Sequence, residues 1–160
     1  MLKIAIGLTV VALSVLIGAR CSDVYKKRVE FYTLLSDLNA DLKRNLAFRR
    51  ESVGNVISSE KYRSAFGALY EALQHEKDNG GIKAADYLPT FLSDAQKERV
   101  ISYFEEVGKN DLVAEEKYIE YNEKIISDEL EQSRNDLKKY KNMGEKLGLS
   151  FGLIIFVLIL

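Results

Sequence analysis

The chain has 160 residues, and its 24 acidic and 23 basic side chains nearly cancel. This balance argues against a general nucleic-acid binder, which usually carries a clear basic excess. The chain has no tryptophan, one proline (Pro89) and one cysteine (Cys21), so an internal disulfide is excluded and a helical fold is favoured.

The first feature along the chain is an apolar N-terminal segment. Lys3 precedes 16 uncharged residues, Ile4 to Ala19, and Arg20 ends the run. A membrane span typically takes about 20 apolar residues. A cleaved signal peptide is the alternative, but no convincing small-x-small cleavage site follows. We therefore predict a transmembrane helix at residues 1–19.

The C-terminal segment has the same character. Residues 147–160 carry no charge and directly follow a lysine-rich stretch that ends at Lys146. Counted from Met143, the segment would form about 27 Å of helix, which is enough to span a bilayer. We predict a second transmembrane helix at residues 147–160, with a start as early as residue 143.

The basic residues beside these two segments predict the orientation. Most of them lie on the side of the central residues 20–146, and only Lys3 and the amino terminus lie outside. Because basic flanks stay in the cytoplasm, the central domain is predicted to be cytoplasmic, with both termini across the membrane. The flanking residues are Arg20, Lys26, Lys27, Arg28, Arg134, Lys138, Lys139, Lys141 and Lys146.

The central region predicts an all-α fold, a compact cytoplasmic bundle of about five to six helices between the two membrane helices. Apolar residues recur every three or four positions in each expected helix. One helix reaches about residue 50, a second covers 60–78 and stops at Gly80, and 82–92 form a short helix and a turn. Ser93 and Gln96 have the spacing of a capping box that opens the next helix, and Gly108 is predicted to end that helix. Another helix begins at about residue 111.

The expected core is the set of apolar residues on these helical stripes. Its members are Val24, Phe31, Leu34, Leu35, Leu38, Leu42, Leu46, Tyr62, Phe66, Leu69, Tyr70, Leu73, Val100, Ile101, Phe104, Val107, Leu112, Ile119, Ile126, Leu130, Leu137 and Tyr140.

Motifs of catalysis or cofactor binding are missing from the sequence. His75 is the only histidine and lies in a hydrophilic helix end, where a solvated surface role is expected. No phosphate-cradling loop or dinucleotide fingerprint is present, and Gly80–Gly81 is explained by a helix stop. The sequence therefore predicts no enzyme, no cofactor, no metal site and no small-molecule substrate.

One basic cluster could contact an acidic partner. It consists of Lys43, Arg44, Arg49 and Arg50, at the membrane-distal end of the first cytoplasmic helix. On an upright helix Lys43 lies about 35 Å from the membrane edge, far beyond the roughly 8 Å reach of the surface potential. The cluster is therefore either a solvated face or a docking site for a protein.

Glycines near the C-terminus predict close helix packing. Gly144, Gly148 and Gly152 recur at every fourth position, so they share one helix face, and Ser14 and Gly18 have the same spacing in the first segment. Small residues at this spacing let membrane helices approach closely. The pattern leaves open whether the packing is within one chain or in a homo-oligomer.

The chain resembles the stage III sporulation protein AB family of spore-forming bacteria, which is itself similar to the cytoplasmic domain of inner-membrane platform proteins of type II secretion and type IV pili. The resemblance covers almost the whole chain. Three stretches carry it by their order and spacing: residues 92–100 (LSDAQKERV), 104–111 (FEEVGKND) and 140–148 (YKNMGEKLG).

The resemblance implies a non-enzymatic scaffold in the channel complex between mother cell and forespore. Its location would be the mother-cell side, in the outer forespore membrane. Its partner would be a hexameric secretion-type ATPase, stage III sporulation protein AA, together with other proteins of the channel complex. Arg49 and Arg50 are the expected contact residues. The turn with Lys109, Asn110 and Asp111 is a further candidate, for which a helix stop and an N-cap are the favoured explanation.

The sequence leaves three alternatives for the function and location of the protein. The chain could be a platform subunit of another type II secretion-like or pilus-like system. It could be a membrane-tethered helical adaptor, although its stripes lack the sustained heptads of a coiled coil. A secreted protein with a cleaved leader would place the domain outside the cell.

Overall fold

The computed structural model describes residues 9, 11–14, 16, 22–48, 51–75 and 83–159. Within its helices, it leaves the side chains of residues 75, 144, 145, 148, 153, 156, 158 and 159 undescribed. The chain divides into two compact units. Unit 1 comprises residues 1–29 and 131–160, and unit 2 comprises residues 30–130.

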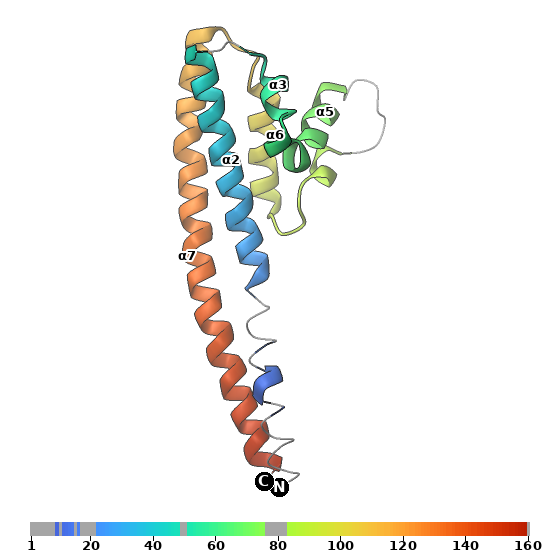
Figure 1. The fold of residues 1–160 in the computed structure, drawn as a ribbon, viewed down its shortest axis with the longest axis vertical. Helices are drawn as coiled ribbons and strands as arrows, with labels where there is room; N and C mark the ends of the chain where they lie inside the picture. Colours follow the sequence, from blue (N-terminus) through green and yellow to red (C-terminus); the bar gives the residue numbers. More distant parts are fainter. Residues whose placement is uncertain are drawn as a thin grey trace. The chain divides into compact units, whose positions relative to one another are not determined.

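All regular elements of the described residues are helical, as the sequence predicts (Figure 1). The helices are α2 (Asp23–Phe48), α3 (Val53–Ile57), α4 (Glu60–Tyr62), α5 (Ala68–His75), α6 (Asp94–Glu106) and α7 (Leu112–Ile159). A π-helical turn (Arg63–Gly67) joins α4 to α5, and a 3-10 helix (Ala84–Tyr87) precedes α6. α2 and α7 each contribute residues to both units.

The core of unit 2 is built around a chain of aromatic rings. Phe66 of the π-helical turn contacts Phe31 of α2, with ring centroids 5.5 Å apart, and Phe104 of α6, with centroids 5.4 Å apart. All three rings are buried. Edge-on and tilted ring pairs of this kind add to the free energy gained by burying the rings. Phe66 therefore joins helices that are distant in the sequence.

Local signals at the ends of α6 act as the sequence predicts. The Ser93 hydroxyl accepts from the Gln96 backbone N–H, and the Gln96 side chain accepts from the Ser93 N–H, which confirms the capping box. Gly108 has a positive φ of 87° just after the helix. A left-handed residue at this point ends a helix, and glycine adopts it without strain.

Two residues of the expected core are exposed, and these expectations were wrong. Val24 lies at the start of α2, and Leu112 is the first residue of α7. The inward-facing residues of the first α7 turns are instead Glu115 and Ile119. Helix periodicity identifies a face but not how far along the helix that face stays covered, and both exposed residues lie at helix starts.

The predicted membrane segments fall in unit 1. Among the residues that the structure describes, none of the helices has the length and apolarity needed to cross a membrane. Most of the N-terminal segment, together with Arg20 and Cys21, lies outside the described residues.

Candidate interaction surfaces

The membrane-distal end predicted from the sequence corresponds to the C-terminal part of α2, where Asp41 gathers several donors. The Tyr62 hydroxyl donates a hydrogen bond to one Asp41 oxygen, and the Arg44 guanidinium donates to the other at 2.6 Å. Lys61 Nζ lies 3.6 Å from Asp41 and 3.1 Å from Asp37. The Tyr62 hydrogen bond, followed by these cations, lowers the pKa of Asp41. Asp41 therefore stays ionised and holds α4 against α2.

A hollow of about 560 Å³ lies beside this cluster. Its lining includes Asp41, Arg44, Asn45 and Phe48 of α2. Asn45 bridges the chain after α2 in both directions, because its amide donates to the Glu51 carbonyl at 2.8 Å and accepts from the Glu51 N–H at 3.2 Å. Such a two-way bridge fixes the wall of the hollow.

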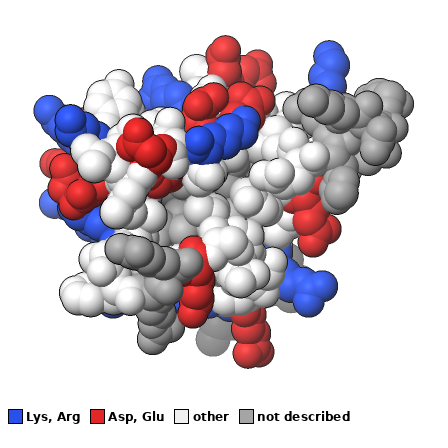
Figure 2. All heavy atoms as spheres, turned by 90° about the horizontal axis from the view of Figure 1, so that it is seen from above, with Lys and Arg blue, Asp and Glu red and all other residues white. Residues whose placement is uncertain are grey.

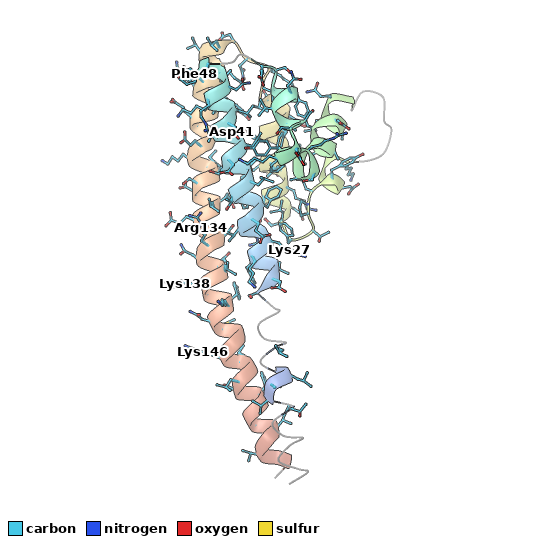
Figure 3. All side chains as sticks on the ribbon, in the orientation of Figure 1. Lys27, Asp41, Phe48, Arg134, Lys138 and Lys146 are labelled. Atoms are coloured by element: carbon cyan, nitrogen blue, oxygen red, sulfur yellow. The ribbon has the colours of Figure 1, made fainter. Side chains whose placement is uncertain are left out.

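Phe48 stands out at this end of α2 (Figure 3). It lines the hollow, yet 85% of the residue is exposed. Aromatic residues and arginine are both enriched in protein–protein interfaces relative to the rest of the surface. Phe48 was not among the predicted contact residues, because it does not belong to the apolar stripe of the helix.

The two described residues of the predicted basic cluster, Lys43 and Arg44, each pair with acidic side chains. Lys43 Nζ lies 3.3 Å from Glu120 and 3.0 Å from Glu123 of α7, and Arg44 pairs with Asp41. Both carboxylates raise the pKa of Lys43, with the Glu123 hydrogen bond contributing most. Arg49 and Arg50 lie outside the described residues. The face seen in Figure 2 mixes basic and acidic side chains among uncharged ones.

Most residues of the turn predicted as a contact site form hydrogen bonds within the chain. Buried Glu115 accepts from the Gly108 N–H at 2.8 Å, and from both the backbone and the side chain of Asn110. Asp111 Oδ1 accepts from the Ala114 N–H at 2.9 Å, so Asp111 caps α7. Lys109 is exposed. These contacts favour the structural explanation of the turn.

A polar connection that was not predicted from the sequence crosses the core of unit 2. Asn39 donates to the Ile119 carbonyl of α7 at 3.1 Å and accepts from the Tyr103 hydroxyl of α6 at 3.0 Å. Burial raises the pKa of Tyr103, which keeps the hydroxyl protonated as a donor. The available signal was an asparagine beside Leu38, within the apolar stripe of α2.

An apolar groove of about 520 Å³ also opens on unit 2. Tyr103 and Val100 of α6 and Tyr118, Tyr121 and Ile126 of α7 contribute to its walls. Tyr121 is 67% exposed, whereas the Tyr118 hydroxyl donates to the carbonyls of Ser102 and Tyr103. The groove thus lies where α6 and α7 are held together by side chain to backbone hydrogen bonds.

In unit 1, one of the predicted glycines is in close contact with the N-terminal segment. A Cβ placed on Gly152 would lie 2.9 Å from Val11 Cα and 3.4 Å from Ser14 Cβ, so a side chain there would collide with backbone. Gly144 and Gly148 are within α7, but their contacts, like Gly18 itself, lie outside the described residues. Gly152 and Ser14 were both predicted as packing residues.

The remaining surface of unit 1 is apolar to an unusual degree. The exposed large residues of this unit include Leu13, Leu16, Met143, Leu147, Leu149, Phe151, Ile154, Ile155 and Val157. Soluble surfaces rarely expose so many adjacent large apolar side chains.

A polar and aromatic contact lies before this apolar surface in α7. Tyr25 of α2 stacks on Tyr140 of α7, with ring centroids 4.3 Å apart and planes 9° from parallel. Arg28 lies over the Tyr25 ring at 5.6 Å and pairs with Asp136 at 3.7 Å. These contacts fix the start of α2 against α7 within unit 1.

Metal and catalytic sites were not expected from the sequence. In the described parts of the chain, no group of three or more His, Cys, Asp or Glu side chains could hold a metal ion. The His75 side chain lies outside the described residues.

Comparison with known proteins places the chain in a family. No curated protein and no solved structure gave a significant match. The family model of stage III sporulation protein AB matches residues 3–160, which is essentially the whole length. The chain therefore belongs to the stage III sporulation protein AB family.

Proposed function

We propose that this protein is a non-enzymatic membrane platform of the channel complex between mother cell and forespore. The observation that carries the proposal is the contrast between the two units. Unit 2 closes an aromatic core of its own, whereas unit 1 exposes large apolar side chains along α7. Lipid is the partner that such a surface fits, because it removes the apolar side chains from water.

The charges beside this apolar surface support a cytoplasmic unit 2. Arg134, Lys138 and Lys146 are carried by α7 before its uncharged end, and Lys27 by the start of α2 (Figure 3). Basic residues next to membrane segments remain on the cytoplasmic side. In this orientation both chain ends cross the outer forespore membrane and unit 2 faces the mother-cell cytoplasm.

Two measurements test this arrangement. The protein should stay in the membrane fraction after alkaline carbonate extraction, because apolar contacts with lipid survive the loss of ionic contacts. A cysteine introduced at Val113 of unit 2, in a Cys21→Ser background, should react with a membrane-impermeant thiol reagent only after lysis. Extraction by carbonate, or labelling in intact cells, would contradict the proposal.

We place the docking surface for a secretion-type ATPase of the stage III sporulation protein AA type at the C-terminal end of α2. Three features support this choice: the exposed Phe48 ring, the exposed Arg44 and the hollow between them. Aromatic and arginine side chains around a recess are typical of residues that dominate binding energy. The Arg44 guanidinium donates to Asp41 at 2.6 Å, while 71% of its side chain stays exposed.

Co-purification of the ATPase from sporulating cells tests the docking surface. Phe48→Ser should reduce the recovered ATPase about tenfold or more, since truncating an anchor residue costs about 2 kcal/mol or more. Val113→Ser is the matched control, because Val113 is also a large exposed apolar residue of unit 2. Equal recovery of the ATPase with Phe48→Ser and with wild type would mean that the ATPase does not dock at Phe48.

A further inference from the structure

The two units carry opposite charge, which the balanced composition of the chain hides. Residues 1–29 and 131–160 contain 10 basic and 4 acidic side chains, a net charge of +6. Residues 30–130 contain 13 basic and 20 acidic side chains, a net charge of −7. The unit with the exposed apolar side chains is therefore also the basic one.

Contacts between α2 and α7 place several basic side chains of unit 1 at the same height along the two helices. Tyr25 stacks on Tyr140, and Arg28 pairs with Asp136. The two helices thus run antiparallel here, so Lys27 lies at the level of Lys138 to Lys141. Besides Lys26, which pairs with Asp23, the lysines at this level are Lys27, Lys138, Lys139 and Lys141, and we call these four the lysine collar.

Two described acidic side chains at this level pair with basic residues outside the collar. Asp23 pairs with Lys26 at 3.2 Å, and Asp136 pairs with Arg28. Within the described residues, the ion pairs of the collar region use Lys26 and Arg28 and not the four collar lysines. All four are exposed. The collar therefore presents the positive charge of four exposed lysines to its surroundings.

The collar lies at the height of lipid headgroups if the apolar part of unit 1 is inserted. Lys141 and Lys138 precede Met143, the first exposed large apolar residue of this part of α7, by two and five residues, or about 3 and 8 Å of helix. The headgroup layer on each side of a bilayer is about 5–8 Å thick, and a lysine side chain can extend toward it. The half-buried Tyr25 and Tyr140 have the place of interfacial aromatic residues.

We propose that the lysine collar binds the phosphate groups of anionic phospholipids such as phosphatidylglycerol. This inference rests on the proposed membrane insertion and adds a lipid preference to it. Each lysine near an anionic surface improves binding about fivefold.

The test uses the full chain in nanodiscs that contain equal amounts of phosphatidylglycerol and phosphatidylcholine. Native mass spectrometry of the released protein measures how far phosphatidylglycerol is enriched among the bound lipids. We expect clear enrichment in the wild type and a loss of tenfold or more in the triple variant Lys138→Gln, Lys139→Gln, Lys141→Gln. The triple replacement by arginine should retain the enrichment.

The matched control removes three charges from unit 2, by Lys83→Gln, Lys117→Gln and Lys124→Gln, and should leave the enrichment unchanged. Equal loss in this control, or no enrichment in the wild type, would overturn the lysine collar as a lipid site. Displacement of the lipid by inorganic phosphate would assign a phosphate-ion site instead and would also overturn it. Nanodiscs of phosphatidylcholine alone separate the two proposals, since failure to insert there contradicts the membrane platform itself.

Discussion

The Tyr103 hydroxyl donates a hydrogen bond to the Asn39 side-chain oxygen at 3.0 Å, and both residues are almost fully buried. Asn39 in turn donates to the Ile119 carbonyl of α7. A buried amide with partners on two sides accepts only one arrangement of its neighbours, because each unpaired group in a low dielectric is costly. This connection therefore fixes the relative register of α2, α6 and α7 within unit 2.

Removing that hydroxyl should destabilise unit 2. Tyr103→Phe leaves the Asn39 oxygen buried without its donor, so we expect a loss of about 1–3 kcal/mol in the free energy of unfolding. Urea denaturation followed by circular dichroism measures it. Tyr121→Phe is the control at an exposed tyrosine of α7 and should change stability by less than about 0.5 kcal/mol. Similar values for the two variants would mean that the hydrogen bond contributes little.

The aromatic core should make unit 2 independent of lipid. We expect a fragment of residues 22–142 to be soluble and helical, because its buried rings are covered by its own helices. In this fragment Phe104→Ala and Leu69→Ala should each cost about 3 kcal/mol, since both side chains are buried. Losses below about 0.5 kcal/mol at both positions, measured by urea denaturation, would contradict the assigned core.

The turn after α6 should tolerate only glycine at residue 108. Gly108 has a φ of 87°, and a Cβ there would lie 2.8 Å from Val53 Cγ2. We expect Gly108→Ala to cost about 2 kcal/mol or more in thermal or urea unfolding, from left-handed strain and the clash together. Gly54→Ala is the control, because its Cβ would meet Tyr70 at an ordinary 3.5 Å and it lies in a helix. That variant should be neutral or more stable by up to about 1 kcal/mol.

The Asp41 cluster predicts a pH dependence of stability. The Tyr62 hydrogen bond holds the pKa of Asp41 below its usual value. Asp41 therefore adds stability above the unfolded-state pKa of about 4, and this contribution is lost as pH falls through the folded pKa. The difference in unfolding free energy between wild type and Asp41→Asn should be largest near neutral pH and should shrink in acid. Asp128→Asn, at an exposed carboxylate of α7, should show a smaller difference at neutral pH.

The contact of Gly152 with Val11 predicts an assembly defect. Gly152→Ile places a branched side chain where even a Cβ would come within 2.9 Å of backbone, so the two segments of unit 1 must separate. We expect normal levels in the membrane fraction, since isoleucine is at least as compatible with lipid as glycine, but reduced co-purification of channel partners from sporulating cells. Leu149→Ile, at an exposed position of α7, is the control. Unchanged assembly of the triple replacement of Gly144, Gly148 and Gly152 would remove the packing role.

Helical class, the capping box at Ser93, the stop at Gly108 and most of the core followed from the sequence, because each depends on the spacing of residues within one helix or turn. The family resemblance was also recognisable from the sequence, and the match over residues 3–160 confirms it. Tertiary structure decided what depends on distant partners. It showed that Lys43 is paired with Glu120 and Glu123, that Asn39 is a buried connector, and that Phe48 is exposed. Opposite charge on the two units emerged only from knowing which segments fold together, since a net charge summed along the chain carries no information about contacts.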